Sequence, residues 1–293
     1  NLAVTSEIIS FNENLKPVSI EVISESDSEL VIQFKLNHFK YNQIDINNEE
    51  YQFIYIPDEV NFLKEGEPAL PHVNRSMIIP DKGGSEITII DSKSRLYSDF
   101  KVSPSKGNIK RNIDISKINY QFGEVYFANQ YYPKNIVELK DPYILRDFRG
   151  QVVQFNPIQY NATKNELNVN YELIVKISFN TMPSTNEFNR FTERKNSLDF
   201  HNIYQNQFIN YTQTRYTPIS EDGEMLIICY DSFMSSMDPF VDWKNQKGIK
   251  TTMVPKSEAG SSASAIKSYV QNFYNSNNLT YLVLVGDKAQ IPT

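Results

Sequence analysis

The sequence predicts an all-β antiparallel sandwich followed by the first part of an α/β domain. Short alternating apolar runs, separated by Gly, Pro, Asn and Asp, fill residues 1–180. A polar stretch over 181–215 breaks this pattern, and we expect a linker with one or two short helices there. In 216–293, continuous apolar runs alternate with helical stripes, which is typical of a parallel sheet covered by helices.

The strands of the first segment are predicted from period-two alternation and from the turn residues between them. In the last run Leu173, Val175, Ile177 and Phe179 share one face, because successive side chains of a strand point to opposite sides. The predicted strands are Ser19–Ile23, Leu30–Leu36, Tyr51–Ile56, Glu86–Ile90, Gly150–Phe155, Leu167–Val169 and Glu172–Phe179. Gly66–Pro71 and Pro80–Gly84 are turn-rich. Together these runs indicate two packed antiparallel sheets.

The rest of the chain changes period. Phe200, Ile203, Tyr204, Phe208 and Tyr211 recur at helical intervals within the linker. Later, Asp238-Pro239 predicts a helix start and Gly248 its end. The predicted strands of this part are Glu224–Tyr230, Ile249–Val254 and Tyr281–Val285, with a second helical stripe over Ile266–Tyr274.

Three parallel strands and two helices bury too little apolar surface for a whole doubly wound domain. We therefore expect 216–293 to be the opening piece of a larger domain, whose remainder is a separate chain after cleavage or lies outside this sequence. The chain begins with Asn1, which fits a removed signal peptide or a trimmed sequence.

Composition excludes several classes of function. The 293 residues are 40% hydrophobic and 22% charged, as in globular proteins, and no apolar run is long enough to span a membrane. The formal net charge of −6 argues against nucleic acid or an anionic membrane as the main partner. No GxGxxG or Walker sequence occurs, so we expect no nucleotide.

Few residues qualify as metal ligands or nucleophiles. The three histidines lie far apart and have no metal-ligand spacing. Cys229 is the only thiol and lies inside an apolar run, which favours a buried structural cysteine over a nucleophile. Gly286-Asp287 at a strand end is consistent with a turn or with a ligand-binding loop. The metal ligands therefore stay unknown.

Two segments with cationic residues are ambiguous on composition alone. Lys106, Lys110 and Arg111 lie in a polar segment that is typical of a solvated face. Arg215 ends a polar stretch at the boundary between the two predicted domains, where exposed linkers are often cleaved.

The chain resembles the arginine-specific gingipains, cysteine peptidases of family C25 in clan CD that are related in fold to caspases. In the last part the resemblance is carried by Tyr216-Thr217-Pro218, Phe240–Gly248, Leu279-Thr280-Tyr281, Leu284–Asp287 and Ile291-Pro292. In the part that resembles their pro-domain it is carried by Gly66–Pro71, Pro104–Gly107, Asp141–Asp147, Arg149–Val153, Gln159-Tyr160-Asn161, Asn210-Tyr211 and Thr214-Arg215.

The resemblance implies a zymogen with an inhibitory β-sandwich pro-domain and the first part of a caspase-like catalytic domain. It implies that Arg111 is the inhibitory anchor in the S1 pocket, with Lys110 as the fallback, and that processing occurs at Arg215–Tyr216. The Cys–His dyad is expected beyond Thr293, so no residue of this chain is expected to be catalytic. Structural calcium, protein substrates, contact of the pro-domain with the remainder of the catalytic domain, and secretion or display on a bacterial cell surface are implied in the same way.

The chain departs from the family pattern at Lys288-Ala289-Gln290, so side-chain ion ligands in that loop are expected to differ. Three alternatives remain open: a lysine-specific or relaxed relative, a scaffold of the same fold that has lost the dyad, and a carbohydrate-binding sandwich fused to an α/β module.

Overall fold

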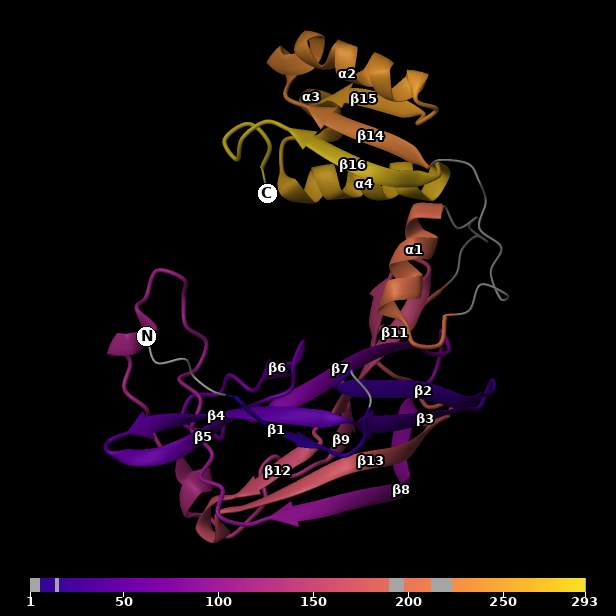
Figure 1. The fold of residues 1–293 in the computed structure, drawn as a ribbon. Coiled ribbons are helices and arrows are strands. Elements are labelled where there is room, and N and C mark those ends of the chain that lie inside the picture. Colours follow the sequence, from indigo (N-terminus) through magenta and orange to yellow (C-terminus); the bar gives the residue numbers. More distant parts are fainter. Residues whose placement is uncertain (1–5, 14–15, 190–197, 212–222, 293) are drawn as a thin grey trace. The chain divides into compact units, whose positions relative to one another are not determined.

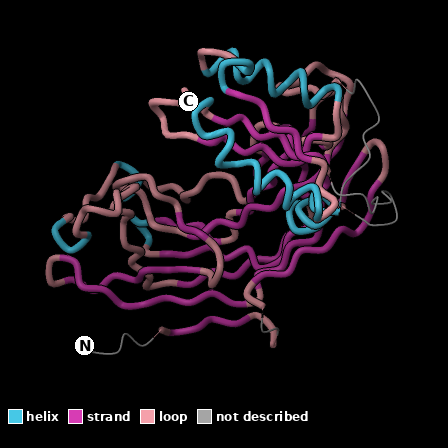
Figure 2. The backbone as a smooth tube through the Cα atoms, turned by 90° about the horizontal axis from the view of Figure 1, so that it is seen from above, coloured by secondary structure: helices cyan, strands magenta, loops and turns pink. Residues whose placement is uncertain are grey.

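The computed structural model describes residues 6–13, 16–189, 198–211 and 223–292 (Figure 1). Its contacts divide the chain into two compact units. The first unit is Asn1–Asn189 with Gln207–Tyr211, and the second is Arg190–Asn206 with Thr212–Thr293. Strands dominate the first unit, and helices flank a small sheet in the second (Figure 2).

The first unit contains thirteen described strands, all joined in antiparallel pairs. They are β1 (Glu7–Ser10), β2 (Val18–Glu25), β3 (Glu29–Leu36), β4 (His38–Ile46), β5 (Glu49–Tyr55), β6 (Val60–Asn61), β7 (Pro71–Ile78), β8 (Ser85–Tyr97), β9 (Val137–Leu139), β10 (Tyr143–Leu145), β11 (Phe148–Phe155), β12 (Ile158–Asn161) and β13 (Glu166–Phe179). Short 3-10 turns cover Ile115–Lys117, Glu124–Phe127 and Ala162–Lys164.

The strands form two five-stranded sheets and one three-stranded sheet. One large sheet has the order β10-β11-β7-β6, with β9 also paired to β11. The other has the order β12-β13-β3-β2, with β8 on the opposite side of β13, and the small sheet has the order β1-β4-β5. The predicted antiparallel sandwich is therefore confirmed.

The main core of the first unit is an apolar cluster shared by both large sheets. Phe34 of β3 stacks on Phe155 of β11 with 4.7 Å between ring centroids, so the two sheets meet through aromatic side chains. Leu173, Val175 and Ile177 of β13 are fully buried in the same cluster, as the alternation of that strand predicts.

The second unit contains a parallel sheet of order β15-β14-β16. Its elements are β14 (Glu224–Cys229), a 3-10 turn (Asp231–Phe233), α2 (Met234–Gln246), β15 (Thr251–Pro255), α3 (Lys256–Ala259), α4 (Ala263–Ser276) and β16 (Leu279–Val285), preceded by α1 (Leu198–Gln207). Along β14, Leu226 and Ile228 pack toward α4, while Ile227 and Cys229 pack toward α2. Burial on both faces explains why this strand is continuously apolar.

The start of α2 corrects the sequence prediction. Asp238-Pro239 was expected to open the helix, but the helix begins at Met234, directly after the 3-10 turn. Met234 and Met237 pack against the sheet, and this burial extends the helix toward its amino end. Pro239 therefore lies inside the helix, where it removes one backbone hydrogen bond. The predicted end is confirmed, since Gly248 has φ = 90°.

The helical stripe over 200–211 is also shorter than predicted. Helix α1 ends at Gln207, and Phe208 and Tyr211 are buried outside it. The chain leaves the helix because Ile209 N donates to Ser76 O of β7 at 3.0 Å, so the backbone pairs with a strand instead. Apolar spacing alone does not distinguish an aromatic residue that packs from a helix from one that packs from a segment paired with a strand.

Candidate functional site

The predicted anchor lies in a long irregular excursion from the sandwich, residues 105–123, which we call the basic loop. Both ends of this loop are held by one residue of the sandwich. Gly66 N donates to Ser105 O at 3.0 Å, and Gly66 O accepts from Gly123 N at 2.8 Å. The outgoing and returning limbs are therefore fixed side by side at their base.

Glycine is required at this junction. Gly66 has φ = +80°, which L side chains rarely adopt. A Cβ on Gly66 would lie 3.2 Å from Gly123 N, and a Cβ on Gly123 would lie 2.9 Å from Gly66 O. The two backbones approach each other too closely for side chains, so the base of the basic loop depends on both glycines.

A tight turn presents the predicted anchor. Ile113 N donates to Lys110 O at 3.0 Å, which places Arg111 and Asn112 at the two central positions of the turn. Both Lys110 and Arg111 are exposed, and neither side chain makes a hydrogen bond or ion pair with any residue that the structure describes. The structure thus presents the Arg111 guanidinium free at the tip of the basic loop.

The returning limb is ordered by a local cap. Asp114 Oδ1 accepts hydrogen bonds from Ser116 N at 3.0 Å and from Ser116 Oγ at 2.7 Å. These bonds to Ser116 favour the charged form of the carboxylate and hold the pKa of Asp114 below its ordinary value. The chain then turns through Ile115–Lys117 and runs back to Gly123.

The charge of the basic loop is opposite to that of the chain. It carries the cations Lys106, Lys110, Arg111 and Lys117 but only one acidic residue, Asp114, while the whole chain has a net charge of −6. A locally positive tip on an acidic chain suits an acidic binding pocket on a partner surface.

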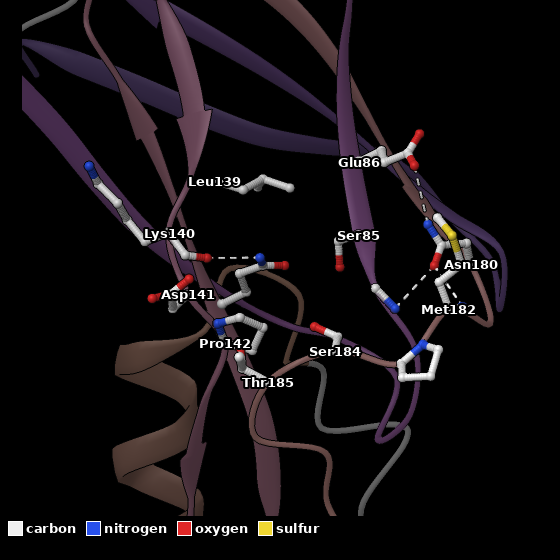
Figure 3. A pocket seen from close by; sticks show the side chains of 13 residues that line it. Ser85, Glu86, Leu139, Lys140, Asp141, Pro142, Asn180, Met182, Ser184 and Thr185 are labelled. Carbon is white, nitrogen blue, oxygen red and sulfur yellow. Dashed lines mark hydrogen bonds between the residues drawn. The ribbon is translucent and has the colours of Figure 1, made fainter.

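The second candidate site is a hollow of ≈ 660 Å³ where residues 180–189, which we call the connector, cross the sandwich (Figure 3). Its polar groups mainly hold backbone segments together. Asn180 Oδ1 accepts from Gly84 N at 3.2 Å and from Met182 N at 3.1 Å, and Gln151 Nε2 donates to Lys140 O at 2.8 Å. The hollow therefore marks the attachment of the connector.

Arg149 of β11 also holds the connector to the sandwich. Its side chain is 1% exposed and donates to three carbonyl oxygens, those of Pro80 at 2.9 Å, Gly83 at 2.8 Å and Thr185 at 2.8 Å. Burial lowers the pKa of the guanidinium, and the charges of Glu187 and Asp81 oppose that effect. The sequence predicts no structural role for Arg149, which enters only among the residues of the family resemblance, because nothing in its local pattern distinguishes a buried arginine from an exposed one.

The predicted processing site, Arg215–Tyr216, lies outside the described residues. The last described residues ahead of this site are fixed to the sandwich through Asn210. Its side-chain oxygen accepts from Ile78 N at 2.7 Å, and its side-chain nitrogen donates to Ile78 O at 3.0 Å. The side-chain amide of Asn210 pairs with β7 as a backbone group of a neighbouring strand would.

The thiol of the second unit is not accessible for reaction. Cys229 is fully buried in β14, as predicted, and burial raises the pKa of its thiol. At the end of β16, Asp287 Oδ1 accepts from Ala289 N at 2.8 Å, so this carboxylate caps a turn. No cluster of three or more His, Cys, Asp or Glu side chains that could hold a metal ion occurs in the described part of either unit.

Two protein-family models match this chain, one after the other. Residues 12–217 match the C25 propeptide, and residues 219–293 match peptidase family C25. None of the helices that the structure describes has both the length and the apolar character needed to cross a membrane.

Curated relatives come from Porphyromonas gingivalis. The chain is 34% identical over 275 residues to gingipain R1, covering 92% of this chain and 27% of that protein. It is 32% identical over 279 residues to gingipain R2, covering 93% and 38%. Similarity to Lys-gingipain HG66 is lower, 21% over 272 residues, covering 87% and 16%. The chain thus spans well under half the length of these relatives.

Two solved structures resemble the fold. The complex of P. gingivalis RgpB pro- and mature domains matches with a TM-score of 0.60 and 30% identity, covering 66% of this chain and 98% of that one. A structure described as giving insight into the zymogenic latency of gingipain K from P. gingivalis matches with a TM-score of 0.51 and 16% identity, covering 60% and 99%, and supports the fold alone.

Proposed function

The chain belongs to peptidase family C25, with that family's propeptide ahead of the start of its peptidase domain, and from this premise we propose that it is part of the zymogen of a cysteine endopeptidase that cleaves after arginine. The first unit inhibits the peptidase domain that the second unit begins. The Cys–His dyad and the protein substrates' binding cleft belong to the sequence beyond this chain. Secretion or surface display on a bacterium is part of the same proposal.

The observation that carries the proposal is the free guanidinium of Arg111 at the tip of the basic loop. Its turn is closed by the bond from Ile113 N to Lys110 O, and the loop is anchored at Gly66. A planar, permanently charged guanidinium binds a carboxylate through two parallel hydrogen bonds, which a lysine cannot match. We place Arg111 in the S1 pocket, with Lys110 as the fallback.

The turn also explains how an arginine can occupy the cleft without being cut at once. Peptidase clefts commonly bind substrate in an extended conformation, and attack requires near-ideal geometry at the scissile carbonyl. In the turn, the Arg111–Asn112 peptide bond lies between hydrogen-bonded neighbours and is not extended. The side chain can then enter S1 while its carbonyl stays out of line with the nucleophile.

Activation is proposed to follow cleavage at Arg215–Tyr216 by another copy of the enzyme. Arginine at both Arg111 and Arg215, together with the greater similarity to gingipains R1 and R2 than to Lys-gingipain, supports arginine specificity. Structural calcium, which the family resemblance implies, is part of the same proposal, and we assign no ligands to it, since the described residues hold no cluster of three or more His, Cys, Asp or Glu side chains.

The test follows activation of the full-length protein. We expect an amino terminus at Tyr216 to appear together with hydrolysis of arginine reporter peptides and not of lysine reporters. Equal hydrolysis of both reporters would identify a relaxed relative. An intact junction with no hydrolysis of either would contradict the proposal and indicate an inactive scaffold.

A further inference from the structure

One side chain joins the two limbs of the basic loop above their base. Lys106, the second residue of the outgoing limb, donates from Nζ to Ile115 O at 3.0 Å on the returning limb. The same ammonium lies 4.3 Å from the centroid of the Tyr120 ring, farther along that limb. A single cation therefore holds two points of the returning limb through two different interactions.

These contacts enclose the turn that presents Arg111. Residues 107–114 lie between Lys106 and Ile115, and Arg111 is near their middle. Below the bridge, the loop is tied at its base, where Gly66 binds Ser105 and Gly123 and where Ser105 N donates to Glu67 O at 2.8 Å. Closing a shorter ring of chain restricts the conformations open to the residues inside it. The bridge therefore acts on the residues that carry the anchor.

The lysine is suited to this position by its length and charge. Its stem spans the gap between the limbs, its three N–H donors reach a carbonyl, and its charge attracts the face of Tyr120. Tyr120 is itself partly buried, and that burial raises the pKa of its hydroxyl. The other lysines of the loop differ, since the side chains of Lys110 and Lys117 have no hydrogen-bond or ion-pair partner among the described residues.

We propose that Lys106 is a positioning residue: it clamps the basic loop so that the Arg111 turn is formed before the loop meets the peptidase. The inference rests on the proposed inhibitory function. An anchor that is already ordered loses less conformational entropy on binding, so it binds more tightly than the same arginine on a loose loop. The clamp also keeps the Arg111–Asn112 bond in the turn, where peptidases cut it slowly.

The test uses three variants of the 293-residue chain. Lys106→Met keeps the length of the side chain but removes its charge and its hydrogen-bond donor, whereas Lys106→Arg keeps the charge and a donor. Lys117→Met is the matched control in the same loop. The first readout is cleavage after Arg111 by an unrelated arginine-specific peptidase, followed by mass spectrometry at a temperature where all variants are folded. We expect Lys106→Met to be cut roughly tenfold faster than wild type, because a charged hydrogen bond and a cation–π contact are lost. Lys106→Arg and Lys117→Met should be cut at nearly the wild-type rate.

The second readout is inhibition of the mature peptidase by each variant added separately. Lys106→Met should inhibit several-fold less well than wild type, and Lys106→Arg should restore inhibition. Wild-type cleavage rates for Lys106→Met, or equal effects of Lys106→Met and Lys117→Met, would overturn the clamp. The first readout does not depend on inhibition, so a failure of the proposed function, seen as full inhibition by Arg111→Ala, is distinguishable from a failure of the clamp.

Discussion

The basic loop and the connector are both irregular segments of the first unit, but they use their polar groups in opposite ways. In the connector, Asn180 and Glu187 accept hydrogen bonds from backbone N–H groups, and Arg149 reaches the Thr185 carbonyl from beneath. In the basic loop, the side chains of Lys110 and Arg111 make no hydrogen bond or ion pair with the residues that the structure describes. The connector is therefore part of the folded sandwich, whereas the tip of the basic loop leaves its cations exposed.

The largest effect should come from removing the buried arginine of the connector. Arg149→Met leaves three carbonyl oxygens without their donor, and we expect a loss of about 3 kcal/mol in the free energy of unfolding of the first unit. The same substitution at exposed Arg111 should change it by less than about 0.5 kcal/mol. Urea denaturation followed by far-ultraviolet circular dichroism measures both. Equal losses would mean that the two segments do not differ as described.

A smaller effect should come from the base of the basic loop. Gly66→Ala forces a side chain into a left-handed conformation and against Gly123, and we expect a loss of about 1–2 kcal/mol. Because both limbs are tied to Gly66, inhibition of the mature peptidase should weaken as well. Asn108→Ala, in the exposed part of the loop, is the control, and its denaturation midpoint should match wild type. A Gly66→Ala midpoint equal to that of Asn108→Ala would contradict the proposed anchoring.

The smallest expected effect is a pH dependence in the connector. Hydrogen bonds from Gly83 N and Ser184 N and the charges of Lys82 and Arg149 hold the pKa of Glu187 below its ordinary value of 4.5. As pH falls, the unfolded chain therefore takes up a proton at this position before the folded chain does. Stabilisation by Glu187 is present above about pH 4.5 and is lost as pH falls through the folded-state pKa.

Thermal denaturation from pH 7 to pH 3 checks this sign. Glu187→Gln should melt below wild type at pH 7, and the difference should shrink toward zero as the pH approaches 3. A difference that is constant over this range would mean that the charge of Glu187 does not contribute to the attachment.

Much of the fold followed from apolar periodicity, and the misses have identifiable causes. Strand β7 was not predicted because Asn74, Arg75 and Ser76 interrupt its apolar pattern. Strand β8 runs to Tyr97, seven residues past its predicted end, because its second half is an exposed edge with little apolar alternation. Strand β13 was predicted as two pieces, but a register shift between Asn170 and Glu172 lets it continue.

The site was less accessible to sequence reasoning than the fold. The position of Arg111 came from the family resemblance, and composition alone indicated only a solvated segment. The bond from Lys106 to Ile115 joins residues nine positions apart in irregular backbone, for which no periodicity exists. The one local signal was Gly66 in a turn-rich stretch, since glycine is favoured where two backbones approach closely.

The central claim is that Arg111 blocks the S1 pocket, and the most direct measurement is inhibition of the mature peptidase by the 293-residue chain and its variants. Arg111→Ala should weaken inhibition by at least ~30-fold, because the pocket carboxylate would be left without its partner. Arg111→Lys should fall between Arg111→Ala and wild type, and Lys110→Ala should match wild type. Wild-type inhibition by Arg111→Ala would contradict the account, and a loss confined to Lys110→Ala would move the anchor to Lys110.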